Sequence, residues 1–136
     1  MAKIQYIPIN PKKYAGDVNN IYGRSSWEIS FMKMVDTNPN IVQWLCEPKH
    51  LNIKYQNPLK KKVCSYWPDF LIKYANGVIE LIEIKPFKET VLTENSTQYD
   101  KLMLVQNHSK WAAAKVFCDK RKINFRVITE KQLFKK

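Results

Sequence analysis

Cysteine and glycine are scarce in this chain of 136 residues, and long apolar runs are missing. The three cysteines, Cys46, Cys64 and Cys118, are widely spaced and form no Cys-x-x-Cys pair, so neither a zinc site nor a disulfide framework is indicated. No apolar stretch is long enough to span a bilayer, and the first residues lack the hydrophobic segment of a signal peptide. We therefore expect a cytosolic protein with reduced thiols and no membrane partner.

The motifs of several common enzyme classes are also missing. The chain has no glycine-rich phosphate-binding loop and no Ser/His/Asp order of the kind that hydrolases use. His50 and His108 are isolated in the sequence, and we assign a catalytic role to neither. The length is that of one domain with a small α/β core.

Acidic residues are few compared with basic ones. Twelve Asp and Glu stand against 23 Lys and Arg, which leaves a net charge of +11 and a pI near 9.6. Such a surface attracts polyanions, and counterion release makes nucleic acid the default partner. The alternative is a basic face that serves solubility or docks on an acidic protein.

Turn residues and apolar periodicity predict the order of the elements. Residues 1–22 are polar and contain two prolines, so we expect an extended N-terminal arm followed by a single domain over 23–136. The expected elements of that domain are a helix over 24–38, strands over 41–44, 51–55, 63–73 and 78–85, a helical segment over 98–121 in two pieces, a strand over 124–129 and a helical turn over 130–134.

The Asn76-Gly77 pair between two apolar runs is a strong hairpin signal. It makes the strands over 63–73 and 78–85 antiparallel neighbours. The helical segment that follows is long enough to return the last strand parallel to the strand over 78–85. The sequence therefore predicts an α/β fold in which the first helix and the crossover helix flank a mixed central sheet with an antiparallel meander.

Charged residues end both strands of this predicted hairpin. Asp69 follows Pro68 on the first strand, and Glu83 and Lys85 share one face of the second. Two carboxylates can hold a hard cation such as Mg²⁺, and a lysine beside them can serve the attacking water or the transition state of phosphodiester hydrolysis. The alternatives are an edge aspartate that caps a turn and a surface Glu–Lys pair.

Glu28 near the start of the first helix has two interpretations. The spacing Ser25-x-x-Glu28 fits a capping box, in which the glutamate bonds back to the first turn of the helix. The second interpretation, a place at the metal site, comes only with the family resemblance that longer blocks of the sequence carry. Both interpretations stay open at this point.

Several basic residues are candidates for contact with nucleic acid, because lysine runs at solvated ends attract phosphate. The runs supply Lys60, Lys61, Lys62, Lys120, Arg121 and Lys122. Lys110 is a separate candidate, because it lies on the predicted crossover helix, where it can line the site.

The spacing of Asp69, Glu83 and Lys85 resembles that of the PD-(D/E)XK nuclease superfamily. Longer blocks resemble a narrower family, the head-completion nucleases of contractile-tailed phages, which are related to the N-terminal endonuclease domain of Tn7-type transposases. The resemblance spans roughly residues 6–133, and its blocks are 22–28, 36–44, 47–48, 66–70, 83–86, 110–114 and 128–131.

The resemblance implies a restriction-endonuclease-like fold and a metal-dependent endodeoxyribonuclease that cleaves double-stranded DNA with Mg²⁺, for which Mn²⁺ substitutes. Its catalytic residues would be Glu28, Asp69, Glu83 and Lys85. The metal ligands would be Asp69, Glu83 and the backbone carbonyl of Ile84, with Glu28 as a further candidate.

The resemblance also implies a role in phage head completion after DNA packaging. We then expect the protein in the host cytoplasm during phage assembly or associated with the virion, with portal or head-neck proteins as candidate partners. Two alternatives remain. One is a structural head-completion or DNA-binding protein with a nuclease fold, and the other is a nuclease of the resolvase or repair type.

Overall fold

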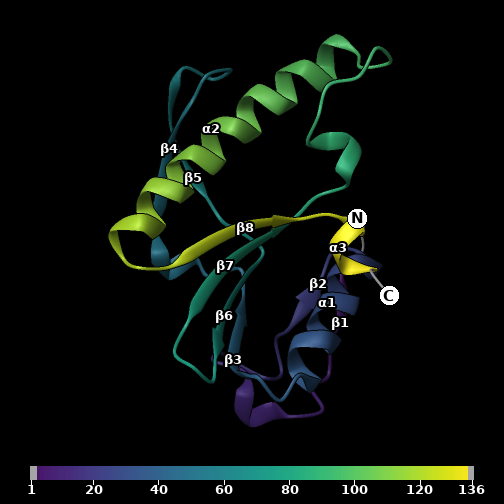
Figure 1. The fold of residues 1–136 in the computed structure, drawn as a ribbon, viewed down its shortest axis with the longest axis vertical. Helices are drawn as coiled ribbons and strands as arrows, with labels where there is room; N and C mark the ends of the chain where they lie inside the picture. The colour runs from purple at the N-terminus through teal and green to yellow at the C-terminus, as the bar shows by residue number, and fades with distance from the viewer. Residues whose placement is uncertain (1–2, 135–136) are drawn as a thin grey trace.

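The structure is a computed structural model that describes residues 3–134 (Figure 1), so the first two residues of the expected arm and the last two of the expected domain lie outside it. Its elements in chain order are β1 (Ile4–Gln5), η1 (Pro11–Lys13), β2 (Tyr22–Gly23), α1 (Ser26–Thr37), β3 (Ile41–Cys46), η2 (Lys49–Leu51), β4 (Ile53–Asn57), β5 (Lys62–Tyr66), β6 (Phe70–Tyr74), β7 (Ile79–Ile84), η3 (Phe87–Glu89), α2 (Gln98–Lys120), β8 (Asn124–Ile128) and α3 (Glu130–Leu133).

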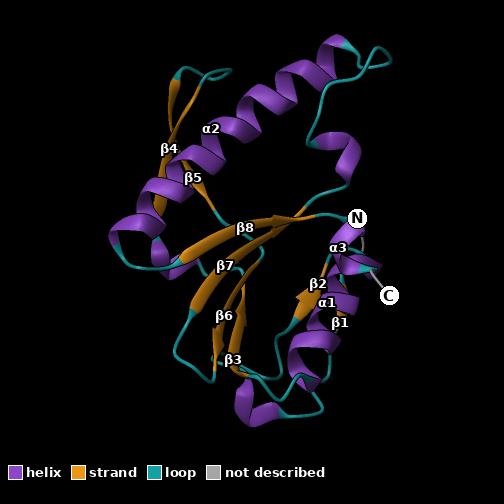
Figure 2. Ribbon diagram, in the orientation of Figure 1, coloured by secondary structure: helices purple, strands orange, loops and turns teal. Residues whose placement is uncertain are grey.

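A four-stranded sheet in the order β3-β6-β7-β8 forms the centre of the fold (Figure 2). The pairs β3–β6 and β6–β7 are antiparallel, and β8 runs parallel to β7. The β6–β7 turn contains Gly77 at φ +90°, a left-handed conformation that glycine adopts without strain. The predicted hairpin, the parallel return of the last strand and the mixed α/β fold class are therefore confirmed.

The strand expected over 63–73 is two strands in different sheets. β5 pairs with β4 in a separate two-stranded hairpin, whereas β6 pairs with β3 and β7. Pro68 lies in the break, where its missing N–H cannot continue a ladder. The antiparallel part of the central sheet therefore skips β4 and β5, which is a correction to the expected run of consecutive strands.

The helical segment expected in two pieces is one continuous helix, α2. Thr97 and Asp100 close a capping box at its start. The polar residues that suggested a break lie inside the helix, where Ser109 Oγ donates to the carbonyl of Val105 at 3.3 Å and Asn107 is buried. Within residues 3–134, no helix combines the length and the apolar character needed to cross a membrane.

The two long helices cover opposite faces of the central sheet (Figure 2). Phe31 of α1 packs with Phe70 and Ile82 in one apolar cluster. Leu81 lies in the other cluster with Ala114 of α2. Successive residues of β7 thus point into different cores, as the two-residue period of a strand requires.

Asp36 at the end of α1 ties the N-terminal segment to the domain. Its buried carboxylate accepts hydrogen bonds from the Tyr6 hydroxyl (2.6 Å), the Ile9 N–H (2.7 Å) and the Asn10 N–H (3.1 Å). Lys13 Nζ donates to three carbonyls in the last turn and C-cap of the same helix. These bonds satisfy a helix end that would otherwise leave its carbonyls without partners.

Candidate active site

Asp69 and Glu83 meet where the β6–β7 pair opens. Asp69 immediately precedes β6, and Phe70 pairs with Ile82, which places Glu83 beside Asp69. Asp69 Oδ2 accepts the backbone N–H of Ile84 at 2.7 Å. The two carboxyls line a pocket of about 360 Å³, together with Arg24, Glu28, Ser65, Tyr66, Trp67, Ile84, Lys85 and Lys110.

Both carboxyls have an increased affinity for protons. Burial, followed by the negative charge of Glu83, raises the pKa of Asp69 well above its usual range, and the Ile84 N–H offsets part of this effect. Burial also raises the pKa of Glu83, against the opposing effect of the Lys85 ammonium. Two adjacent carboxylates are unfavourable when both are charged. A cation bound between them would remove that cost.

Lys85 continues the strand on the face of Glu83. Its backbone N–H donates to the carbonyl of Ile128 at 2.9 Å, so the end of β8 holds this residue in place. The side chain is half-buried and lines the carboxylate pocket. The Ile84 N–H is directed towards Asp69, and the N–H and C=O of one strand residue face the same edge. The Ile84 carbonyl is therefore placed towards the carboxylates.

Glu28 takes part in the pocket while Ser25 caps the helix. Ser25 Oγ accepts the backbone N–H of Glu28 at 3.2 Å, which is one of the two bonds of a capping box. The Glu28 carboxyl lines the pocket, and burial and the charge of Asp69 raise its pKa. The Ser25 side chain thus caps the helix, and the Glu28 carboxyl, which also interacts with the backbone N–H of Arg24, lines the site.

Lys110 is the predicted basic residue that the fold brings into this pocket. Its Nζ lies 5.8 Å from the ring centres of both Tyr55 and Tyr66. Burial lowers the pKa of Lys110, and the positive charge of Lys85 lowers it further. The pocket therefore contains two lysines beside the acids.

The other predicted basic residues lie elsewhere. Lys60, Lys61 and Lys62 are exposed at the β4–β5 turn. The positive charge of Lys60 contributes to the lowered pKa of Lys110. The run 120–122 lies at the far end of α2, roughly 15 Å beyond Lys110 by the rise per residue of a helix. The fold does not gather these residues at the carboxylates.

Three further pocket neighbours carry polar atoms that the predicted site did not include. Arg24 Nη2 lines the pocket and pairs with Glu47 at 2.7 Å. Tyr66 Oη and Trp111 Nε1 are buried and make no hydrogen bond of strict geometry among the described residues. The Tyr66 hydroxyl nevertheless lies close enough to the Glu83 carboxyl and to the Trp111 side chain to interact with both. Burial and then the charge of Glu83 raise the pKa of Tyr66, so its hydroxyl remains a hydrogen-bond donor. Arg24, Tyr66 and Trp111 lie in the blocks 22–28, 66–70 and 110–114 that resemble the nuclease family, and this was the one sequence signal that pointed to these residues.

The donor set suits Mg²⁺ better than Zn²⁺. Within residues 3–134, no three His, Cys, Asp or Glu side chains gather closely enough to hold a metal ion by themselves. Mg²⁺ is bound by one or two carboxylates and keeps several waters, whereas structural Zn²⁺ needs four protein ligands. The Asp69–Glu83 pair, with a strand carbonyl beside it, fits the first case.

Comparison with known proteins places the chain among nucleases. Residues 38–130 match the family described as TnsA-like endonuclease N terminal. The chain is also 35% identical, over 136 aligned residues, to the head completion nuclease of Enterobacteria phage T4. This alignment covers 93% of the chain and 89% of the relative. Both matches agree with the resemblance predicted from the sequence blocks.

Proposed function

We propose that this chain, which belongs to the TnsA-like endonuclease N-terminal family, is a Mg²⁺-dependent DNA endonuclease that acts in phage head completion. The family and the T4 relative both support a nuclease. The observation that carries the proposal is the meeting of Asp69, Glu83 and Lys85 in one pocket at the end of β7.

Asp69, Glu83 and the Ile84 carbonyl would hold the metal, with Glu28 on the α1 side of the pocket. When bound, Mg²⁺ supplies a Lewis acid that polarises the scissile phosphate and makes water a better nucleophile near neutral pH. The raised pKa values of the two carboxyls support this assignment, because a divalent cation stabilises both in their charged form.

Lys85 and Lys110 would act on the phosphate and on the attacking water. The backbone of Lys85 is held by β8 and the residue lines the pocket, so its ammonium can orient water and offset the charge that develops on the phosphate oxygens. Lys110 projects from α2 into the same pocket and can bind the phosphate before cleavage. Preorganised donors of this kind accelerate the reaction because they need no reorganisation in the transition state.

The place in head completion follows the T4 relative, which is named a head completion nuclease. We extend that role to this chain, with double-stranded DNA as substrate, the host cytoplasm as the site of action during assembly and portal or head-neck proteins as partners. The net charge of +11 favours such a substrate.

Plasmid cleavage tests the activity. Purified protein should nick or cut plasmid DNA in Mg²⁺ and lose this activity in EDTA, and Asp69→Ala and Glu83→Ala should be inactive in Mg²⁺. Asp119→Ala, which removes an exposed carboxylate paired with Lys115 on α2, is the control and should cut normally. Cleavage in EDTA, or by Asp69→Ala at the wild-type rate, would overturn the proposal.

A substitution in the gene of the phage itself tests the biological role. A phage whose own copy of this gene carries Asp69→Ala should yield few infectious particles, although the protein is made in normal amounts. A normal yield would favour the structural alternative, in which the fold serves assembly and the nuclease site does not.

A further inference from the structure

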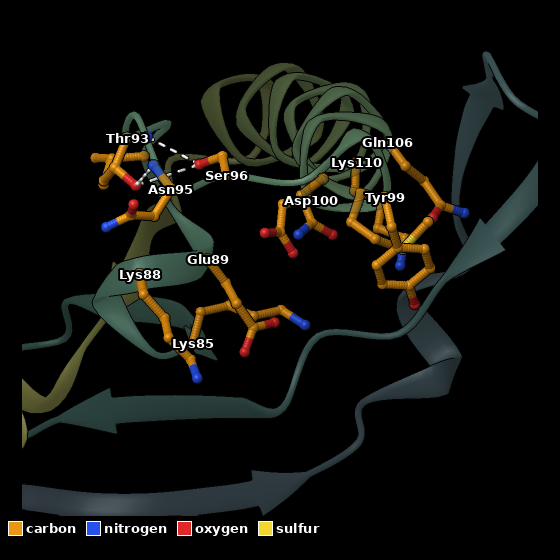
Figure 3. A pocket seen from close by; sticks show the side chains of 13 residues that line it. Lys85, Lys88, Glu89, Thr93, Asn95, Ser96, Tyr99, Asp100, Gln106 and Lys110 are labelled. Atoms are coloured by element: carbon orange, nitrogen blue, oxygen red, sulfur yellow. Dashed lines mark hydrogen bonds between the residues drawn. The ribbon is translucent and has the colours of Figure 1, made fainter.

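A second cavity opens beside the carboxylate pocket, between the first half of α2 and the segment over 85–97. Its volume is about 710 Å³, and it shares Lys85 and Lys110 with the carboxylate pocket. Figure 3 shows Lys85 and Lys88 on one wall and Tyr99 and Lys110 on the wall formed by α2. A molecule bound at the carboxylates could therefore extend into this cavity past the two shared lysines.

The walls of the cavity combine cations with neutral polar groups and an aromatic ring. Lys85, Lys88 and Lys110 supply three ammonium groups. Buried Asn107 contributes a side-chain amide, and Tyr99 is 67% exposed, so its ring is free for a ligand to stack on. Phosphate at the lysines and a base on the ring would use both kinds of wall, as in proteins that bind single-stranded nucleic acid.

Two carboxylates also line the cavity and limit where phosphate can lie. Asp100 accepts the N–H of Thr97 at 2.9 Å in the helix cap, so part of its charge is already compensated. Glu89 would repel a phosphate, and its carboxylate can accept hydrogen bonds from the amino groups of bases. The phosphate end of a nucleotide is therefore favoured at the shared lysines, and the base end is favoured at the Tyr99 ring.

The size of the cavity decides between duplex and single strand. A volume of about 710 Å³ is that of a small-ligand pocket. A duplex, whose major groove alone is about 12 Å wide, does not enter such a space. A nucleotide whose base enters this cavity must therefore be unpaired, whereas a duplex can lie only across its mouth.

We propose that this cavity binds unpaired nucleotides next to the cleavage site, so that the preferred substrate is DNA with a single-stranded flank. This inference rests on the proposed nuclease function. The lysines shared by the two pockets hold the phosphates at the junction, and Tyr99 stacks on a base of the flank.

Binding measured without metal tests the inference, because it does not depend on cleavage. Fluorescence anisotropy in EDTA compares a flush duplex with the same duplex carrying a short single-stranded flank, 5′ or 3′. Wild-type protein should bind one flanked duplex about 5- to 150-fold more tightly, the range expected for one base stacked on an aromatic ring. Tyr99→Ala should lose this preference and keep its affinity for the flush duplex.

Matched variants separate a local effect from a change in charge or fold. Leu102→Ala removes an exposed apolar side chain of the same helix that does not line the cavity, and it should keep the preference. Lys88→Ala and Lys101→Ala remove one positive charge each, but only Lys88 lines the cavity. Lys88→Ala should reduce the preference several-fold, and Lys101→Ala should leave it unchanged.

Two results would overturn the inference: equal affinity of the wild-type protein for flush and flanked duplexes, or a preference that persists in Tyr99→Ala. Plasmid cleavage in Mg²⁺ reports separately on the proposed function. If the protein cleaves plasmid but shows no preference, the cavity proposal alone fails. If it prefers flanked DNA in EDTA but cuts no DNA in Mg²⁺, the nuclease proposal fails and the binding site stands.

Discussion

Asp69 Oδ2 lies 2.7 Å from the backbone nitrogen of Ile84 and accepts its hydrogen bond across the open end of the β6–β7 pair. This bond occupies one carboxylate oxygen and fixes the direction of the other. It also satisfies the amide of the residue between Glu83 and Lys85. The same aspartate therefore has a structural partner on β7 and a proposed role in metal binding.

Two substitutions at Asp69 should separate these roles. Both Asp69→Asn and Asp69→Ala should abolish cleavage, because a hard cation loses a charged ligand. Asn keeps an oxygen that can accept the Ile84 N–H, whereas Ala leaves this amide without a partner, at a cost of about 1–3 kcal/mol. Urea unfolding without metal should show Asp69→Ala to be less stable than Asp69→Asn by that amount. Equal stability of the two variants would mean that the hydrogen bond between Asp69 and the Ile84 N–H does not stabilise the fold.

Without metal, the pair of carboxyls should make stability fall as pH rises. Both carboxyls have pKa values that are raised in the folded state. At a pH between the unfolded pKa and the folded pKa of these groups, the folded protein therefore binds more protons than the unfolded protein. The free energy of unfolding should therefore decrease as pH increases from about 4, near the unfolded pKa of Asp, up to the folded pKa. Thermal melts of wild type and Asp69→Asn over this range, in EDTA, measure the effect as their difference. A difference that does not change with pH would contradict the prediction, and added Mg²⁺ should stabilise the wild type most at the higher pH.

Lys85→Met should slow cleavage by about two orders of magnitude or more, the scale for loss of one preorganised electrostatic partner. Metal and DNA binding should remain, because the carboxylates and the basic surface are intact. Single-turnover cleavage beside a thermal melt and a Mn²⁺ titration separates rate from stability. A Lys85→Met variant that cuts at the wild-type rate would leave Lys85 as a surface lysine without a catalytic role.

Glu130 in α3 should affect the active site indirectly, because it positions the backbone that follows Lys85. Its Oε1 accepts the backbone N–H of Phe87 at 2.7 Å, two residues after Lys85, and Lys131 Nζ lies 3.5 Å from the centre of the Phe87 ring. Glu130→Ala should therefore lower the cleavage rate about 10- to 100-fold, as is usual when the support of a catalytic group is lost. Glu130→Gln keeps an accepting oxygen and should restore most of the rate. If the two variants cut equally slowly, the charge of Glu130 is needed and the hydrogen bond does not explain its effect.

DNA binding should depend steeply on salt and weakly on sequence, because the chain carries a net charge of +11. Lys110→Ala should lower the slope of log K against log salt by about one, the value for loss of one phosphate contact. Anisotropy between 50 and 200 mM salt, roughly the range over which such contacts weaken, measures the slope. An affinity that stays constant over this range would contradict an interface made mainly of phosphate contacts.

The sequence by itself determined the features that depend on a few adjacent residues. Asn76-Gly77 specifies the β6–β7 turn, Asn38-Pro39 ends α1, and the two-residue period of a strand puts Glu83 and Lys85 on one face. The carboxylate pair follows from that hairpin alone. Local backbone preferences decide each of these features, so they can be read without knowledge of the rest of the chain.

Only the tertiary structure decided which distant segments meet. Pro68 ends one strand, but the change of partner from β4 to β3 depends on the packing of whole sheets. Tyr66 and Trp111 come together because β5 and α2 pack against the same face of β7, and residues 99–110 of the continuous α2 form one wall of the cavity beside Lys110. Contacts between residues far apart in sequence arise from burial of shared apolar surface. Such burial leaves no signal in local periodicity or spacing, so only the family-like blocks 66–70 and 110–114 pointed to Tyr66 and Trp111.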